Sequence, residues 1–218
     1  MAGIVVTGTD TGVGKTFFSC LLLEALRGEG VDAVGYKPVS CGSREDAEAL
    51  VEASGRVETI DLVNPVHLNA PAAPMVAAEL QNERVDLPDL VSHAGALADR
   101  HELVVVEGVG GWEVPMAPGE TFADFAVMLG WPVVLVVANK LGAMNHTLLS
   151  AGAIRHRDLP LAGMVLNHLE EERDVAMVTN KSVLVDWVNP PCWTELMPGQ
   201  DWLDEGLAQT MAGIARRP

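Results

Sequence analysis

The stretch Gly8-Thr9-Asp10-Thr11-Gly12-Val13-Gly14-Lys15-Thr16 decides the fold of this 218-residue chain. It follows the apolar run Ile4-Val5-Val6-Thr7 and leads directly into an apolar helical stretch. Strand, glycine loop and helix in this order form a phosphate site, because glycines let successive backbone N–H groups converge on phosphate oxygens at a helix N-terminus. We expect Lys15 to reach the β- and γ-phosphates of a nucleotide and Thr16 to offer its hydroxyl to Mg²⁺. We also expect Gly12, Val13 and Gly14 to bind the nucleotide through the backbone of the loop.

The glycine loop departs from the strict G-x-x-x-x-G-K-[ST] pattern of phosphate loops. Five residues separate Gly8 from Gly14, and Thr9 stands at the usual position of the first glycine. A tight strand-to-helix turn with a solvated lysine is the simpler alternative. The flanking strand and helix favour nucleotide binding, because they are the context that the motif requires.

Apolar runs typical of buried strands alternate with helical stretches, which is the order expected of a parallel sheet covered by helices. The expected strands are Gly3 to Thr7, Val31 to Lys37, Leu103 to Glu107, Pro132 to Ala138 and Ala162 to Asn167. The expected helices are Lys15 to Arg27, Arg44 to Ser54, Leu87 to Arg100, Thr121 to Leu129, Asn145 to Arg155 and Arg173 to Trp187. We therefore predict an α/β fold, a P-loop NTPase-like doubly wound, mostly parallel sheet with helices on both faces, formed by residues 1–218 as a single domain.

Glycines and prolines predict where some of these elements end. Gly28 and Gly55 stand where C-terminal helix caps are expected. The segment Asn64 to Pro74 is rich in proline and small residues, and we interpret it as a surface loop because the alternation resumes after it. Near the C-terminus, apolar spacing predicts a core-packing helix in preference to a membrane-surface one, on Leu203, Leu207, Met211 and Ile214.

Composition excludes several classes of protein. With 49% hydrophobic and 20% charged residues, the chain can form a sizeable core. Its formal charge of −16 argues against binding to duplex nucleic acid or to anionic membranes. No apolar stretch reaches the ~20 residues of a membrane-spanning helix, and the first residues lack a signal-peptide pattern, so we expect a cytoplasmic protein. The distant Cys20, Cys41 and Cys192 suggest neither a disulfide framework nor a zinc site.

A phosphate loop also needs a carboxylate at a second strand end to hold the metal. Glu107 supplies one, since the apolar run Leu103-Val104-Val105-Val106 aims it at the carboxyl edge of the sheet, where ligands of open α/β folds bind. A solvated strand-end glutamate is the alternative. Asp46 is ambiguous, because Ser43-x-x-Asp46 also fits a helix capping box.

The segment Asn139-Lys140-Leu141-Gly142 is comparable with the N-K-x-D guanine motif of GTP-binding proteins. Gly142 stands where the guanine-reading carboxylate would be, so GTP specificity has little support. His146, at the start of the following helix, is best interpreted as a surface residue.

Together these motifs resemble the dethiobiotin synthetase family of ATP-dependent ligases. The similar blocks span roughly the first three quarters of the chain and weaken beyond His168. They are Thr7 to Thr16, Gly35-Tyr36-Lys37-Pro38-Val39, Val106-Glu107-Gly108-Val109-Gly110-Gly111-Trp112, Lys140-Leu141-Gly142-Ala143-Met144-Asn145-His146 and Ala162-Gly163-Met164-Val165-Leu166-Asn167.

The resemblance implies a homodimer that binds Mg·ATP on the glycine loop and closes 7,8-diaminononanoate with CO₂ to the cyclic urea of dethiobiotin. It also implies roles for single residues. It implies that Thr11, Lys15 and Lys37 belong to the active centre and that Asn167 contacts adenine. It implies metal binding by Thr16, Asp46 and Glu107. Lys37 precedes Pro38, which favours an extended strand exit at the same sheet edge as the loop, although a solvated lysine is the alternative.

Two further features concern the substrate that the resemblance implies. Cys41 stands where a hydroxyl residue is expected near the substrate, with Ser40 adjacent. The substrate carboxylate is expected on the partner subunit, where a helix N-terminus suits an anion, at Leu141, Gly142, Ala143, Met144 and Asn145.

Two rival functions remain open at this point. A regulatory P-loop ATPase of the partitioning type would share the fold, but it carries a lysine at the position that Asp10 fills. A related ATP-dependent ligase acting on another amine or carboxylate is the second rival, and the loop does not exclude it.

Overall fold

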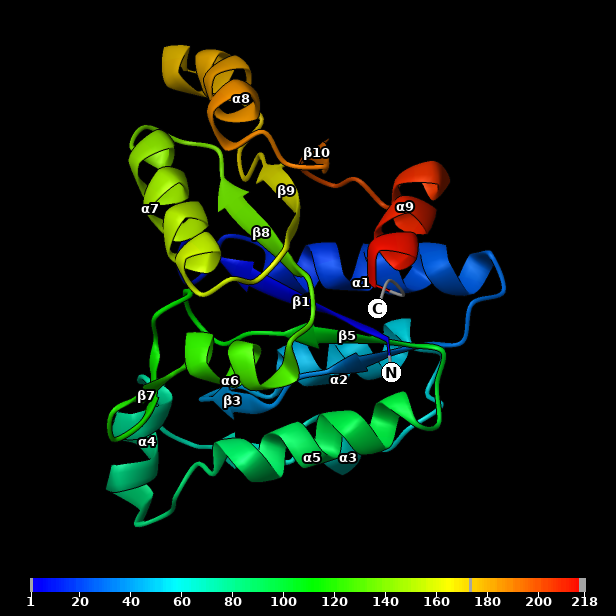
Figure 1. Ribbon diagram of the computed structural model, residues 1–218, viewed down its shortest axis with the longest axis vertical. Coiled ribbons are helices and arrows are strands. Elements are labelled where there is room, and N and C mark those ends of the chain that lie inside the picture. The colour runs from blue at the N-terminus through cyan, green and yellow to red at the C-terminus, as the bar shows by residue number, and fades with distance from the viewer. Residues whose placement is uncertain (1, 173, 216–218) are drawn as a thin grey trace.

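The computed structural model describes residues 2–172 and 174–215. Its centre is a six-stranded sheet in the order β10-β9-β8-β1-β5-β2 (Figure 1), and every neighbouring pair of these strands is parallel. The strands are β1 (Gly3–Gly8), β2 (Ala33–Tyr36), β5 (Leu103–Glu107), β8 (Val133–Ala138), β9 (Leu161–Asn167) and β10 (Cys192–Leu196). The predicted parallel sheet is confirmed, with one strand more than the sequence pattern showed.

Apolar side chains of the central strands alternate between two buried layers. In β1, Ile4 and Val6 belong to one layer and Val5 to the other. The first layer is covered by α1 (Lys15–Gly28), α2 (Glu45–Ala53) and α9 (Glu205–Ala215). The second is covered by α5 (Leu87–Ala98), α6 (Phe122–Leu129), α7 (Ala143–His156) and α8 (Val175–Val188). Helices thus cover both faces, which confirms the doubly wound prediction, and α9 packs beside α1 although the two lie at opposite ends of the chain (Figure 1).

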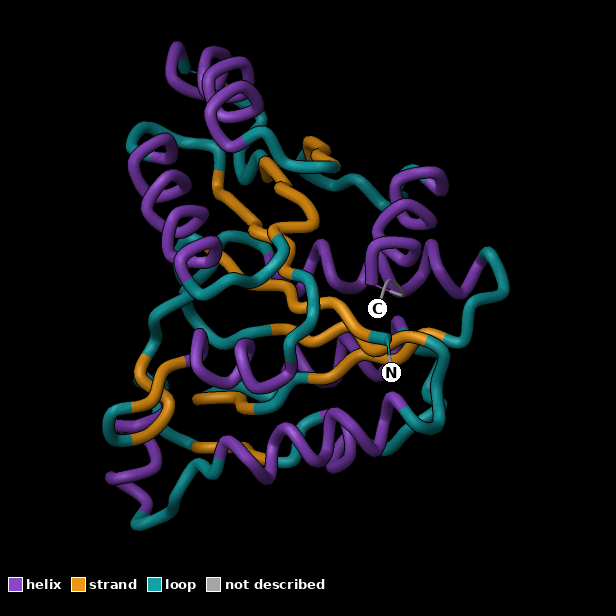
Figure 2. The backbone as a smooth tube through the Cα atoms, in the orientation of Figure 1, coloured by secondary structure: helices purple, strands orange, loops and turns teal. Residues whose placement is uncertain are grey.

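Two small sheets stand apart from the central one (Figure 2). The first pairs β3 (Val39–Cys41) with β4 (Val66–Leu68), and the second pairs β6 (Pro115–Ala117) with β7 (Glu120–Thr121). Short helices α3 (Ile60–Val63) and α4 (Pro74–Gln81) flank β4.

The interpretation of Asn64 to Pro74 as a surface loop is wrong. The segment contains β4, and its last residue begins α4. Asn64 is fully buried, and its side-chain amide is satisfied by donating to the backbone oxygens of Lys37, at 2.8 Å, and Val66, at 3.1 Å. A polar residue that satisfies buried backbone groups does not mark the surface.

The predicted helices are present, with shifted ends. The cap at Gly28 is wrong, because α1 continues through this residue and the glycine with positive φ is Gly30, at 81°. Gly55, with φ of 71°, follows α2 as predicted. Arg173, the expected start of α8, lies outside the described residues. The C-terminal helix is confirmed as α9, which buries Met211 against the core. No helix in the described ranges combines the length and apolar character that crossing a membrane requires.

Candidate active site

A cavity of about 700 Å³ opens at the carboxyl ends of β1 and β2, beside the glycine loop. Its polar wall brings together most of the predicted site residues, namely Thr11, Gly12, Gly14, Lys15, Thr16, Lys37, Ser40, Cys41 and Asp46. The wall is completed by Ser43, Pro71, Ala72, Ala73, Pro74, Val109, Gly110 and Val114. This is the sheet edge at which open α/β folds bind ligands.

The glycine loop has the shape that phosphate binding needs. Gly14 precedes α1 in a left-handed conformation, with φ of 93°, and no side chain caps the helix. The first N–H groups of α1 therefore lack a side-chain partner, which suits an anion. Asn167, at the end of β9, donates its side-chain amide to the Val13 carbonyl at 2.9 Å. A Cβ on Gly14 would lie 2.0 Å from that amide nitrogen, so only glycine fits there.

Lys15 is held by backbone oxygens of two loops. Its Nζ donates to the Gly110 oxygen at 2.6 Å and to the Asp10 oxygen at 3.1 Å. Burial, followed by the neighbouring Lys37 ammonium, lowers the pKa of Lys15 to about 8. Its ammonium is therefore a charge that an arriving phosphate would stabilise.

Lys37, Asp46 and Glu107 form what we call the site cluster. Lys37 Nζ lies 2.5 Å from Glu107 Oε1 and 2.8 Å from Asp46 Oδ2. The Lys37 and Glu107 side chains are 4% and 0% exposed. Burial by itself lowers the pKa of Lys37, but the two carboxylates outweigh it and hold that pKa above its usual value. The same contact with Lys37 holds the pKa of Asp46 below its usual range, against its partial burial.

Thr16 joins the site cluster through Glu107. The Thr16 hydroxyl donates to Glu107 Oε1 at 2.7 Å. Within the described residues, Glu107 Oε2 is buried and lacks a hydrogen-bond partner. Asp46 forms no capping box, because Ser43 Oγ accepts from Glu45 N and the Asp46 carboxylate faces Lys37. The side-chain oxygens of Thr16, Asp46 and Glu107 thus lie close together around the Lys37 ammonium, and their metal binding stays a prediction.

Other predicted residues lie outside this cavity. Glu107 is fully buried and contacts the cavity residues Thr16 and Lys37. Val13 is a buried residue of the glycine loop, and the Asn167 amide is directed at the backbone of this loop. Its predicted adenine contact stays a prediction. The segment 141–145 does not line the cavity of its own chain, and Leu141 within it is 81% exposed.

Sequence reasoning missed the apolar wall formed by Pro71–Pro74, Val109 and Val114. The proline-rich composition of the first segment was interpreted only as a surface loop. Val109 lies within the motif Gly108-Val109-Gly110-Gly111-Trp112, and Val114 follows it by two residues, so the motif marked this part of the site. Their neighbour Gly110 supplies the oxygen that Lys15 contacts.

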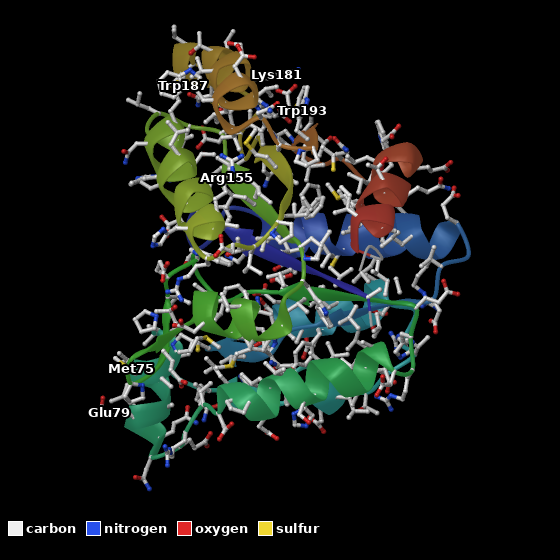
Figure 3. The ribbon with its side chains drawn as sticks, in the orientation of Figure 1. Met75, Glu79, Arg155, Lys181, Trp187 and Trp193 are labelled. Atoms are coloured by element: carbon white, nitrogen blue, oxygen red, sulfur yellow. The ribbon has the colours of Figure 1, made fainter. Side chains whose placement is uncertain are left out.

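A second charged group, which we call the edge cluster, lies on α8 and the edge strand β10. Lys181 pairs with Glu195 at 2.6 Å, and its Nζ lies 4.7 Å from the ring centre of Trp193. Figure 3 labels Lys181 and Trp193. Glu195 also lies 3.2 Å from Nε2 of the buried His168. Nearby, the Asn139 side chain donates to the Met177 oxygen and accepts from Asn180, so it is not available to read a guanine base.

Comparison with known proteins agrees with this geometry. A family profile described as an AAA domain matches residues 2–185. The ATP-dependent dethiobiotin synthetase of Akkermansia muciniphila is 48% identical over 94% of this chain and 96% of its own length. The enzyme of the same name from Anaeromyxobacter dehalogenans is 48% identical over 83% of this chain and 82% of its own.

Solved structures with low sequence identity support the fold alone. The MinC:MinD cell division complex of Aquifex aeolicus gives a TM-score of 0.59 at 15% identity, covering 99% of this chain and 95% of the other. A plasmid partition protein from Borrelia burgdorferi gives 0.58 at 12%, covering 98% and 97%. The high identity to the named ligases decides the family. By sequence, and in agreement with the site geometry, the chain belongs to the ATP-dependent dethiobiotin synthetases.

Proposed function

We propose that this ligase converts 7,8-diaminononanoate, CO₂ and ATP into dethiobiotin, ADP and phosphate. The observation that carries the proposal is that the loop lysine Lys15 and Lys37, which is paired with the buried Glu107, line one cavity in a chain 48% identical to enzymes of that name. A nucleotide and a second substrate can then meet at a single site.

The reaction proceeds in three bond-forming steps. One amine nitrogen of the substrate attacks CO₂ and loses a proton, which gives a carbamate. A carbamate oxygen attacks the γ-phosphorus of ATP, ADP leaves, and a carbamic-phosphoric anhydride forms. The second amine then attacks the anhydride carbonyl, the C–O bond to phosphate breaks, and the amine proton is lost as the cyclic urea closes.

Lys15 and Lys37 act in the phosphorylation step, in which two anions approach each other. Their ammonium groups offset this repulsion and stabilise charge on the transferring phosphoryl group. Burial strengthens the effect, since both lysines are buried. Thr11 and Ser40 supply hydroxyls beside them, and Cys41 supplies a thiol.

The residues present fit Mg²⁺. This cation prefers oxygen ligands and usually binds through one or two carboxylates, waters and substrate phosphates. We assign it to Thr16, Asp46 and Glu107, on the ground that Glu107 Oε2 is buried without a partner in the described chain. When bound with ATP, Mg²⁺ would neutralise charge on the β- and γ-phosphates.

The active enzyme is proposed to be a homodimer in which the partner completes the site. Leu141 to Asn145 do not line their own chain's cavity, and they lead into α7 through Gly142, whose φ is 90°. No acidic residue lies in the first turn of α7, so its N-terminus suits the substrate carboxylate. Activity per chain should fall on dilution below the dimer dissociation constant. A monomer that stays fully active removes this part of the proposal.

The overall reaction is tested with Mg·ATP, ¹⁴C-bicarbonate and the diamine. We expect acid-stable label in a cyclic urea and ADP formation that depends on the diamine. ADP formation without any need for the diamine would favour a regulatory ATPase. Turnover with a different amine alone would favour a related ligase. The cytoplasmic location remains a prediction from the sequence.

A further inference from the structure

The site cluster contains one ammonium between two carboxylates. Lys37 Nζ contacts Glu107 Oε1 at 2.5 Å and Asp46 Oδ2 at 2.8 Å, and it also lies 3.4 Å from the Gly108 oxygen. Thr16 donates to the same Glu107 oxygen. The two carboxylates that the proposed function assigns to the metal are therefore the ones that Lys37 already contacts, each through one oxygen, while Oε2 of Glu107 has no partner in the described chain.

We propose that the Lys37 ammonium and a divalent cation compete for the facing oxygens of Asp46 and Glu107. Lys37 then excludes cations from the site until a nucleotide supplies phosphate oxygens as further ligands. This inference rests on the metal site of the proposed function, and it adds a role for Lys37 before any chemistry takes place.

The burial of Glu107 explains why the competition would be strong. A carboxylate with no exposed surface is costly unless a cation or hydrogen-bond donors face it, and Lys37 provides both. Mg²⁺ loses its water reluctantly and would gain only two carboxylates and a hydroxyl from this chain. Displacing Lys37 becomes favourable when phosphate oxygens bind the metal and also attract the released ammonium.

Lys15 offers a matched control, because it carries the same charge in the same cavity. Its ammonium contacts the backbone oxygens of Asp10 and Gly110 and neither of the two carboxylates. Simple charge repulsion of a metal would be relieved by removing either lysine. Competition for oxygens would be relieved only by removing Lys37.

The test measures Mn²⁺ binding to the nucleotide-free protein by electron paramagnetic resonance. We expect Lys37→Met to lower the Mn²⁺ dissociation constant by about tenfold or more. This is the size of the change in metal affinity that follows when the partners of metal ligands are altered. Lys15→Met should change it by less than about threefold. Equal shifts in the two variants, or no shift in Lys37→Met, would overturn the proposal. Near-UV circular dichroism checks the fold, and Lys37→Gln provides a second neutral side chain at this position.

A measurement on the wild-type protein does not depend on any variant. Mass spectrometry can follow the acetylation of Lys37 by a small reagent as MgCl₂ is raised without nucleotide. We expect Lys37 labelling to increase, while labelling of the exposed Lys140 stays constant. Unchanged Lys37 labelling at Mg²⁺ concentrations that saturate the site would contradict competition.

A last comparison separates this inference from the metal assignment. With a non-hydrolysable ATP analogue present, Glu107→Gln should bind Mn²⁺ more weakly than wild type. If it binds Mn²⁺ equally well, the metal site itself is wrongly assigned. If it binds more weakly but Lys37→Met has no effect on the nucleotide-free protein, only the competition is wrong.

Discussion

The site cluster and the edge cluster each pair lysine with carboxylate, but they differ in burial. In the site cluster, the Lys37 and Glu107 side chains are 4% and 0% exposed; Lys37 directly follows β2, the other edge strand of the sheet, and Glu107 ends its neighbour β5. In the edge cluster, Lys181 and Glu195 are 44% and 19% exposed and lie on α8 and the edge strand β10. Both contacts are short, at 2.5 and 2.6 Å. Distance alone therefore does not separate the two.

The difference in burial implies different consequences of losing each pair. An exposed ion pair contributes about 0–1 kcal/mol, because water screens it and side-chain entropy opposes it. A buried pair carries a desolvation cost that a hydrophobic replacement would avoid, so it is weak evidence for stability. Preorganised buried charge is, however, what stabilises a developing charge in a reaction. The predictions below start from this contrast.

The largest effect is expected from Lys37→Gln. The variant should fold and bind nucleotide but lose on the order of 10²-fold or more in kcat, as when one preorganised electrostatic donor is removed. Steady-state kinetics with the diamine, together with equilibrium binding of a fluorescent ATP analogue, measure both quantities. Near-normal turnover by a folded variant would exclude Lys37 from the catalytic charge cluster.

Glu107→Gln tests the carboxylate of the same pair. The Mg²⁺ concentration for half-maximal activity should rise about 10- to 100-fold, the range for changed metal surroundings. A Mg²⁺ titration at saturating ATP measures it, with Glu195→Gln as the matched control from the edge cluster. An unchanged titration would make Glu107 a structural residue only.

The third prediction concerns the pH dependence of nucleotide binding. The pKa of Lys15 is lowered to about 8, so its ammonium loses its proton as the pH rises through that value. If only the charged form holds phosphate, the nucleotide dissociation constant should rise about tenfold between pH 7 and pH 9. Calorimetric titrations at both pH values test this. Lys15→Arg should show no such rise, and a parallel rise in that variant would contradict the assignment to Lys15.

Lys181→Gln should have the smallest effect. Its kcat should equal that of the wild type, and the free energy of unfolding should fall by no more than about 1 kcal/mol. Urea denaturation at pH 7 measures the change. A kcat loss comparable to that of Lys37→Gln would show that burial does not distinguish the two clusters.

The urea denaturation experiment can also measure how the stabilisation from the edge cluster changes with pH. Burial raises the pKa of Glu195, but the Lys181 and His168 contacts outweigh it, and the pKa is lowered overall. The stabilisation from this carboxylate is therefore present above its usual pKa and is lost as the pH falls through the folded-state value. The difference between wild type and Lys181→Gln should shrink on acidification.

The central sheet could be predicted from sequence because its strands are long apolar runs. Leu103–Glu107 has the predicted bounds, and β1, β8 and β9 differ from their predictions by one residue at an end. The small strands could not be found this way, because a strand of three residues such as Val39–Cys41 is too short to show a hydrophobic periodicity. Strand β10 was missed because Trp193, Thr194 and Glu195 interrupt its apolar pattern.

The site was predictable where strand ends and the glycine loop carry the chemistry. Glu107 ends β5, and Lys37 directly follows β2, which is its parallel neighbour. Because the carboxyl ends of parallel strands meet at one edge of the sheet, the proximity of the two residues followed from topology. The wall at Pro71–Pro74 could not be inferred, because tertiary packing alone brings α4 to the cavity. The Lys15 contact with Gly110 depends on loop geometry that spacing does not encode.

The hydrogen bond from Asn167 to Val13 bears on when the protein becomes functional during folding. The two residues are 154 positions apart, so the glycine loop is held in shape by a strand that is synthesised much later. A contact of such sequence separation forms late, because the long intervening chain must first be ordered. A nascent chain that ends before β9 would contain the complete loop sequence but not its support. We therefore expect nucleotide affinity to arise only once the last third of the polypeptide has docked, so that ligand binding reports completed assembly of the sheet.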